Sequence, residues 1–410
     1  MAPTKIAVLS HPGLTSKSYM PIHNFQHLAS YNLIRGSTPA IAVPGSPNLW
    51  SPPSSGTYSS SPSHYERPVQ APKYPLEPLF RALLIEEPRF RLDSIDIVSD
   101  RDSLWQLLSF VNPSHGHVAA FRIEAEVVGG TVIFCRTDGG QSKDVSTNAQ
   151  LDEYEEIERQ FEKTLTTPHV ESSASHHRVI SYELGEIRFM VCYEAKVFVE
   201  RPQPVRRNNG IPDTPESLPP PKTAYPASPT SDLMVIKEGH EVLPGKIGGV
   251  KVAAADGLGR INHTLSQMWL SRTVVFVSAV HKYGQLIRPL VASAYDEVMN
   301  WEKQYQTDIR NLVQILGNII SLMKSRSKRT VIEYDPDPGK LVVWSGEEAT
   351  RMLPDDLYVR LKHPERERRR STKRAGLEST ARAGLVGAER IGLEIERPKS
   401  PVPWNYPERL

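Results

Sequence analysis

Residues 176–200, HHRVISYELGEIRFMVCYEAKVFVE, decide the fold that we expect for this chain. The run 179–184 is rich in the β-branched and aromatic residues that strands favour. From Ile187 to Tyr193, large apolar side chains occupy every second position, which is the period of a strand. Gly185-Glu186 separates the two runs and suits a tight turn. The stretch therefore predicts two neighbouring strands joined by a hairpin turn.

The second strand leads into Glu194-Ala195-Lys196. Side chains two positions apart on a strand project from the same face, so Glu194 and Lys196 are expected to lie side by side. A glutamate and a second charged group on one strand face can form the floor of a metal site. They can also form a solvated, salt-bridged edge. The triplet taken alone favours the solvated edge, and the rest of the chain has to decide between the two.

The composition bounds the class of protein. The chain has 410 residues, a formal charge of +2, an apolar fraction of 39%, 35 prolines and 25 glycines, which indicates a globular core diluted by flexible segments. Its two cysteines, Cys135 and Cys192, lie in apolar runs, as buried free thiols do, and this suits a reducing compartment. The sequence shows neither a secretory apolar region near its start nor a membrane-spanning apolar run. We therefore expect a nuclear or cytoplasmic protein.

Proline and charge divide the chain into segments. We expect one core made of residues 25–200 and 232–361. The segments outside or within this core that we expect to be flexible are the N-terminus 1–24, the Pro/Ser-rich stretch 44–73, the Pro-rich insertion 201–231 and the charged tail 362–410. The tail opens with seven Lys or Arg against two Glu over residues 362–374. Such a run is either a solvated tail or a signal for nuclear import or nucleic-acid binding.

Within the core, strand and helix patterns alternate. An acidic amphipathic helix is predicted over 152–165, and a long helix with an apolar stripe over 294–324. The other predicted helices cover 77–84, about 102–110 and 260–270; the other predicted strands cover 94–98, 120–128, 131–136, 233–236, 247–252, 273–280, 285–290, 331–334 and 341–344. This order predicts an α/β (α+β) protein with a mixed central sheet flanked by helices.

The order of certain short motifs resembles a known family. Gln160-Phe161-Glu162 closes a predicted helix, Glu194-Ala195-Lys196 follows on a strand, Gly248-Gly249-Val250-Lys251 lies on a later strand, and Trp269 on the next helix. This layout is similar to the DXO family of decapping exonucleases, which have the PD-(D/E)xK nuclease fold. In fungal relatives of that family, phrases like LASYN, PGSPxLWSPP, DRxxxxxLLxFVNPS and HHRxISY recur, and they are found here from positions 28, 44, 100 and 176. The resemblance covers about residues 25–345.

The resemblance implies phosphodiester hydrolysis with Mg²⁺ or Mn²⁺. Hard cations of this kind need several convergent carboxylates. Glu162 matches the helix glutamate of the family, Glu194 the first acid of its Glu-x-Asp, and Lys251 the lysine of its Glu-x-Lys. Three positions depart from the family: Lys196 stands for the aspartate, Gly249 for the glutamate and Arg272 for the glutamine of Trp-x-x-Gln.

These departures lead us to expect a salt-bridged relic of a metal centre. Two unit charges about 4 Å apart interact by roughly 4 kcal/mol at an effective dielectric near 20, and Lys196 would repel a divalent ion about twice as strongly. We expect Glu162 and Glu194, the remaining candidate metal ligands, to pair with Lys196 and Lys251 instead. Lys196, Lys251 and Arg272 are then candidates to hold a phosphate backbone.

Three functions follow from these expectations. The preferred one is a catalytically impaired decapping-nuclease-like protein that binds RNA 5′ ends or a nuclease partner, with no metal cofactor. The second is an active Mg²⁺- or Mn²⁺-dependent decapping enzyme or exonuclease. The third is an inert scaffold that recruits partners through its proline-rich and basic segments. The pair His176-His177 is expected to be structural, because adjacent strand side chains point to opposite faces.

Overall fold

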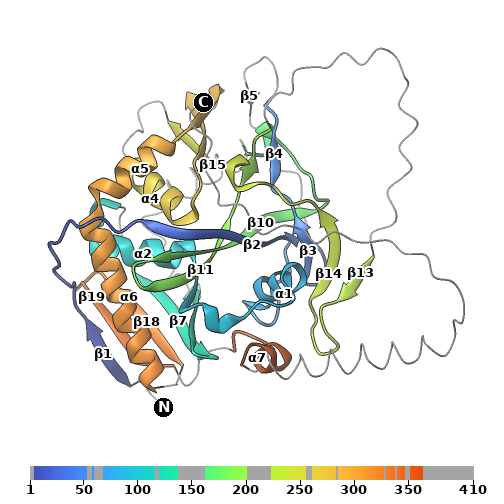
Figure 1. The fold of residues 1–410 in the computed structure, drawn as a ribbon. Coiled ribbons are helices and arrows are strands. Elements are labelled where there is room, and N and C mark those ends of the chain that lie inside the picture. The colour runs from blue at the N-terminus through green and yellow to red at the C-terminus, as the bar shows by residue number, and fades with distance from the viewer. Residues whose placement is uncertain are drawn as a thin grey trace, which may run out of the picture.

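The computed structural model describes residues 4–52, 58–59, 68–115, 120–136, 162–200, 223–254, 261–282, 285–326, 329–337, 339–346 and 351–362. The strands form two mixed sheets between helices, which confirms the α/β class (Figure 1). The twelve-stranded sheet runs, in spatial order, β1 (Lys5–Leu9), β19 (Lys340–Ser345), β18 (Thr330–Asp335), β7 (Phe121–Val128), β8 (Thr131–Arg136), β6 (Ile97–Asp100), β11 (Ile187–Glu194), β10 (Ser173–Leu184), β2 (Ile22–Ile34), β3 (Ala40–Gly45), β14 (Met234–Gly239) and β13 (Ala224–Pro226).

The second sheet has seven strands. In spatial order these are β5 (Tyr58–Ser59), β17 (Gln285–Ser293), β16 (Val275–Lys282), β15 (Ile247–Ala254), β12 (Val197–Phe198), β4 (Asn48–Trp50) and β9 (Thr166–Thr167). The helices around the sheets are α1 (Glu77–Glu86), α2 (Arg101–Val111), α4 (Ile261–Ser271), α5 (Tyr295–Gln304), α6 (Gln306–Arg326) and α7 (Asp355–Lys362), with short 3-10 turns at Leu92–Ser94, Pro113–His115 and Pro244–Lys246. None of these described helices is long and apolar enough to cross a bilayer.

The predicted hairpin lies at the centre of the first sheet. β10 and β11 pair without interruption from His177↔Glu194 to Leu184↔Ile187, and Gly185 makes the turn with a φ of +60°. Since neighbouring side chains point to opposite faces, β11 serves two cores at once. Phe189 packs with the helices α2, α4, α5 and α6, whereas Met190 packs with α1 and α7.

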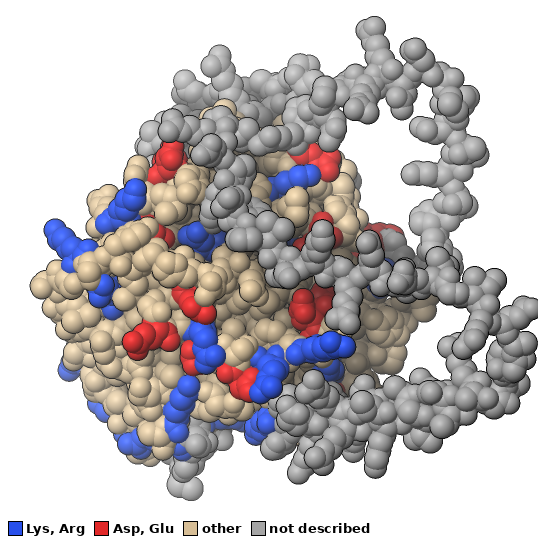
Figure 2. Space-filling model, in the orientation of Figure 1, with Lys and Arg blue, Asp and Glu red and all other residues tan. Residues whose placement is uncertain are grey.

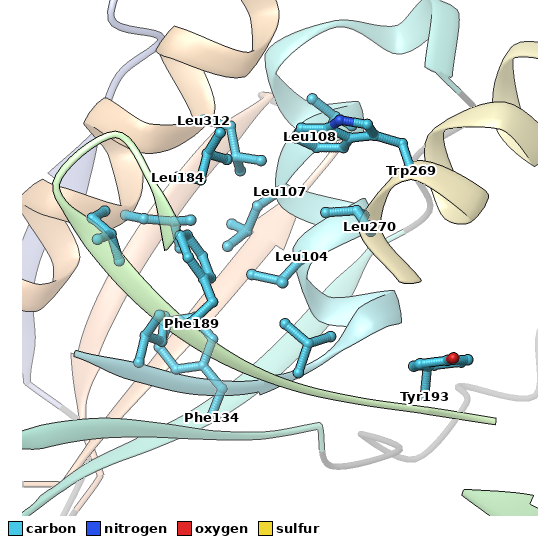
Figure 3. Packing of buried hydrophobic residues seen from close by; sticks show 14 of the residues in the cluster. Leu104, Leu107, Leu108, Phe134, Leu184, Phe189, Tyr193, Trp269, Leu270 and Leu312 are labelled. Atoms are coloured by element: carbon cyan, nitrogen blue, oxygen red, sulfur yellow. The ribbon is translucent and has the colours of Figure 1, made fainter. Parts of the chain in front are cut away.

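The two cores therefore lie on opposite faces of the same sheet. Figure 3 shows the first, in which Leu104 and Leu107 of α2 meet Leu270 of α4 and Phe189 of β11. The second core is built around α1, where Phe80 and Leu83 are fully buried. Fully burying side chains of this size stabilises a fold by about 1.5–3 kcal/mol each. The site described below therefore lies at the end of a strand that packs against a hydrophobic core on each face.

The predicted long helix over 294–324 is divided. α5 ends at Gln304 and α6 begins at Gln306, with Tyr305 between them in a non-helical conformation. The carbonyl oxygen of Glu302 accepts a hydrogen bond from Nε2 of Gln306 at 2.8 Å. In a continuous helix this carbonyl would accept from the backbone N–H of Gln306. The apolar stripe predicted one helix because it does not show that the Gln306 side chain competes with the backbone N–H for the Glu302 carbonyl.

Several segments expected to be flexible contain ordered elements. Within 1–24, β1 pairs with β19 and β2 already begins at Ile22. The KIAVL run of β1 is short, but it completes an edge of the sheet. Within 44–73, β3 ends and β4 forms, while residues 53–57 and 60–67 lie outside the described chain. Within 201–231, β13 pairs with β14, and residues 201–222 lie outside the described chain, as does the tail beyond residue 362.

Candidate functional site

The site lies where the chain passes from one sheet to the other. β11 ends at Glu194 in the first sheet, and β12 begins at Val197 in the second. Ala195 is buried at the junction, and its N–H donates to the carbonyl of His176 at 2.8 Å. This anchor fixes the backbone between Glu194 and Lys196. The two charged side chains are therefore presented together at the seam between the sheets.

Glu162 reaches the same place from a different element. Residues 162–165 form a helical turn, and Oγ1 of Thr166 donates to the carbonyl of Glu162 at 2.6 Å. Leu165 then packs against Trp50 and Val197 in a small buried cluster of the second sheet. The remainder of the helix predicted over 152–165 lies outside the described residues.

Lys196 joins the two glutamates. Its Nζ lies 2.6 Å from Oε1 of Glu194 and 3.8 Å from Oε2 of Glu162. The three side chains are 43%, 35% and 21% exposed respectively, so the cluster is partly open to solvent. Burial opposes the charge of Lys196, but the two carboxylates outweigh it and raise the pKa of the ammonium. The pairing that we predicted for Lys196 is thus present.

Two further side chains border the cluster, and sequence reasoning missed both. His177 stands opposite Glu194 in the hairpin, its Nε2 lies 2.9 Å from Oγ of Ser175, and its ring stacks on Tyr31. Burial lowers the pKa of His177, Glu194 acts in the opposite direction, and Lys196 adds to the lowering. The hairpin register was the one signal that placed this histidine beside Glu194.

The second of these is Arg101, which opens α2 directly after Asp100. Asp100 caps the helix by accepting the backbone N–H of Ser103 at 2.7 Å. Arg101 pairs with Asp102 at 2.9 Å, and its charge is close enough to act against the protonation of Lys196. Acidic and basic side chains thus alternate around the cluster.

Gly249 and Lys251 lie on β15, which pairs with β12 through Val197↔Gly248 and Phe198↔Ile247. Continuing this antiparallel register places Gly249 opposite Lys196. A Cβ at Gly249 would meet Cγ of Met268 at 3.8 Å and the carbonyl of Val275 at 4.0 Å, which is ordinary contact. The backbone of Lys251 is paired with Ser278 of β16, and its side chain lies outside the described atoms.

Arg272 has a different set of partners. It follows α4 in the left-handed region, with a φ of +54°, and its side chain is only 10% exposed. Its Nη1 lies 3.8 Å from Oε2 of Glu302. The same buried carboxylate accepts Nε1 of Trp269 and the hydroxyl of Tyr19, both at 2.6 Å. The charge of Arg272 therefore offsets that of a buried glutamate, whereas the charge of Lys196 offsets those of the two glutamates at the seam.

The donor set at the seam is a poor match for Mg²⁺ or Mn²⁺. These ions take several oxygen ligands, whereas Glu162 and Glu194 supply two carboxylates that already share an ammonium. Across the described residues, no group of three or more His, Cys, Asp or Glu side chains is arranged to hold a metal. Figure 2 shows Lys and Arg interspersed with Asp and Glu over the described part of one face, and no field of a single sign.

Solved structures share this fold at low sequence identity. Rai1 of Candida albicans, in complex with pU5 and Mn²⁺, aligns with a TM-score of 0.59 and 10% identity over 88% of this chain and 100% of its own. Rai1 of Scheffersomyces stipitis, with (3′-NADP)⁺ and calcium, gives 0.57 and 11% over 88% and 100%. Rai1 of S. pombe gives 0.56 and 11% over 83% and 99%. This similarity shows that the chain has a mixed α/β fold like that of the Rai1 proteins, which agrees with the fold that the motif order predicted.

Sequence comparison gives a family but no characterised relative. No curated protein matches the chain. A family model described as a domain of unknown function, DUF8563, matches residues 10–362. This range includes every described strand of both sheets except β1, as well as the seam that carries Glu162, Glu194 and Lys196. The chain therefore belongs to the DUF8563 family.

Proposed function

We propose that this chain is a decapping-nuclease-like protein of impaired catalysis, which binds RNA 5′ ends or a nuclease partner without cleaving RNA. The observation that carries the proposal is the position of Lys196. Its ammonium lies between Glu162 and Glu194, the two candidate metal ligands. In this fold the cations activate water and neutralise the charge that develops on phosphorus. An ammonium can neutralise charge, but it cannot supply a metal-bound hydroxide.

The same cluster suits the binding of a phosphate group. Lys196 is 43% exposed and keeps its charge, since its pKa is raised. Arg101 lies near it at the first turn of α2. Cations that contact phosphates release counterions, so their binding weakens steeply with salt. RNA is the ligand class that we propose, and a nuclear or cytoplasmic location stays a prediction.

The competing function is an active Mn²⁺- or Mg²⁺-dependent decapping enzyme or exonuclease. One observation favours it: the exposed ammonium of Lys196 is held by a flexible stem and can rotate into solvent, which would free both carboxylates. This function requires Mn²⁺-dependent cleavage of capped or 5′-phosphorylated RNA that is lost in Glu194→Ala.

The test measures binding and cleavage on the same material. A 5′-phosphorylated single-stranded RNA with a 3′ fluorophore is titrated with wild type, with Lys196→Gln and with Lys237→Gln as control. Lys237 is an exposed lysine on β14, and its loss removes the same charge elsewhere. We expect Lys196→Gln alone to weaken binding several-fold and to lower the salt slope by about one. Equal affinities for all three proteins would remove the binding proposal, and Mn²⁺-dependent turnover would establish the active alternative.

A further inference from the structure

Three phrases of the sequence meet in one buried hydrogen-bonded network. Nδ1 of His176 lies 2.7 Å from Oδ1 of Asn32, and that oxygen also accepts the backbone N–H of Ser46 at 2.8 Å. The amide nitrogen of Asn32 donates to the carbonyl of Ser46 at 2.9 Å and to Oγ of Ser173 at 2.7 Å. These contacts fix the orientation of the Asn32 amide. Nδ1 of His176 must therefore carry the proton, and its Nε2 is an acceptor in the neutral ring.

Arg178 lies beside this network and is only 1% exposed. Its Nη1 donates to the carbonyl of Val242 at 2.9 Å. Its Nε and Nη2 are buried with no hydrogen-bond partner, and so are Nε2 of His176 and Nε2 of His27. Few groups of this kind stay unsatisfied in folded proteins, so four in one region need an explanation.

The strand register places the three side chains together. His176 and Arg178 are two positions apart on β10 and share a face. His27 of β2 stands opposite Ile180, the next position of β10 on that face. His27 and Arg178 are therefore diagonal neighbours, which in a sheet lie about 7–8 Å apart between their backbones, and His176 lies beyond Arg178 on the same face. The charge of Arg178 acts on both histidines and helps burial to lower their pKa values.

Burial lowers the pKa of the Arg178 guanidinium, and Tyr193 and Glu241 act in the opposite direction. Arginine stays protonated in proteins, and burying its charge is costly unless an anion pairs with it. In the parts of the chain that the structure describes, no carboxylate oxygen forms a salt bridge with Arg178. Glu241 lies 3.3 Å from Nδ1 of His27 instead and is 60% exposed. Arg178 is therefore held without a direct ion pair among the described residues.

We propose that His27, His176 and Arg178 form a binding site for a protonated phosphate group, separate from the Glu162, Glu194 and Lys196 cluster. Nε and Nη2 form one edge of the guanidinium, the fork that binds two oxygens of an oxyanion side by side. The two imidazole Nε2 atoms are acceptors, because each Nδ1 faces a carboxylate or amide oxygen. Monobasic phosphate has two bare oxygens for the fork and two hydroxyls for the imidazoles.

This complementarity selects among anions. Sulfate offers the same oxygens as phosphate but carries no hydroxyl at neutral pH, so it cannot donate to His27 or His176. Free phosphate supplies both hydroxyls, whereas the terminal phosphate of a nucleotide has one and can donate to only one of the two imidazoles. His240 and Glu241 are exposed, and the carbonyl of the next residue, Val242, accepts Nη1 of Arg178.

The experiment is a titration of the full chain in chloride buffer, followed by calorimetry and by the melting temperature. Inorganic phosphate, sulfate at equal ionic strength and AMP are the three probes. We expect saturable binding of phosphate, at least tenfold weaker binding of sulfate, and loss of phosphate binding in Arg178→Lys, which keeps the charge but not the fork. Arg89→Lys, on an exposed arginine, is the matched control.

If Arg178→Lys does not fold, His27→Gln carries the test, since that side chain lies closer to the surface. Tighter binding of AMP than of phosphate would assign the site to a nucleotide terminus, and the reverse to free phosphate. Equal stabilisation by sulfate and phosphate, or phosphate stabilisation that persists in both Arg178→Lys and His27→Gln, would overturn the proposal.

Discussion

Nζ of Lys196 lies 2.6 Å from Oε1 of Glu194, in the two-residue link between the last strand residue of one sheet and the first of the other. The backbone here is held by two sheets, so the charged groups can be changed without moving the scaffold. The proposed impairment is then a matter of charge at two positions, Lys196 and Gly249. Reversing it is the most direct way to examine it.

The double variant Lys196→Asp/Gly249→Glu is expected to bind Mn²⁺. The first change removes the ammonium and adds a ligand, and the second adds another carboxylate where a Cβ meets nothing closer than 3.8 Å. Together with Glu162 and Glu194, the site would then have four acidic side chains, a set that suits a hard cation. Calorimetric titration with Mn²⁺ measures the gain over wild type.

Two controls accompany this variant. Adding Glu194→Gln should abolish the new Mn²⁺ binding. Moving the glutamate to Gly248 should fail, because a Cβ there would lie 3.0 Å from Cγ2 of Val197 and 3.2 Å from Cγ2 of Val277. Mn²⁺ binding by Lys196→Asp/Gly248→Glu as tight as that of the Gly249 variant would contradict the register on which the site is built.

Glu302 is expected to be the acid on which the interior beside α4 depends. It is 1% exposed and accepts hydrogen bonds from Trp269 and Tyr19, with Arg272 at 3.8 Å. Glu302→Ala removes the carboxylate that lies 3.8 Å from the buried guanidinium of Arg272, and it should lower the free energy of unfolding by about 3–5 kcal/mol. Glu302→Gln keeps an acceptor and should cost about 1–3 kcal/mol. Urea unfolding of both variants measures these differences.

The control for this prediction lies on the same helix. Glu297 is exposed on α5, and Glu297→Ala should change the stability by no more than about 0.5 kcal/mol. Similar losses for Glu297→Ala and Glu302→Ala would mean that the helix, and not the buried carboxylate, is responsible.

Local sequence patterns predicted what depends on neighbouring residues in the chain. The period of residues 187–193 placed Phe189 and Met190 on opposite faces, and the spacing of Glu194 and Lys196 predicted their contact. Each of these outcomes is decided within a few residues, where strand and helix geometry leave little choice.

Features that depend on distant segments were not predicted. The pattern of residues 176–200 does not show that the chain changes sheets at Ala195, because the sequence of a strand does not indicate which other strands it pairs with. Arg272 was expected at the candidate site, but its partner Glu302 comes from another helix. Arg178 would ordinarily face solvent on a strand, and its burial arises from the cover at Val242. The role of a charged residue was thus set by tertiary packing.

The stability of the protein is expected to fall as the pH drops below about 6.5, the usual histidine pKa. Burial lowers the pKa of His176 and His177, and burial with Arg178 lowers that of His27 to about 3. A lowered folded pKa means that unfolding takes up protons, so the stability present above pH 6.5 is lost toward the folded value. Each proton contributes a slope of about 1.4 kcal/mol per pH unit.

His27→Gln should reduce this slope by about one proton's worth between pH 6 and 4. His23→Gln, on an exposed position of the same strand, is the control and should leave the slope unchanged. The measurement is urea unfolding at several pH values in chloride buffer without phosphate, so that the proposed anion site stays unliganded. Equal slopes for His27→Gln and wild type would show that His27 is already protonated in the folded protein.

The network around Asn32 is expected to depend on Gly45. Gly45 has a φ of +65°, and a Cβ there would lie 2.0 Å from Oδ1 of Asn32, the atom that holds both Ser46 and His176. Gly45→Ala must therefore displace the Asn32 amide as well as strain the backbone. We expect it to lower the free energy of unfolding by more than about 3 kcal/mol.

A substitution at Gly13 separates the cost of backbone strain from the cost of displacing the Asn32 amide. It has a φ of +70°, close to that of Gly45, but a Cβ there would meet nothing within 4 Å. Gly13→Ala should therefore cost only the backbone strain, about 1–2 kcal/mol. Guanidinium unfolding of both variants gives the difference, which measures the displacement of Asn32. Equal losses at the two positions would mean that the network adjusts freely, and that the amide does not hold His176 in the protonation state on which the phosphate site depends.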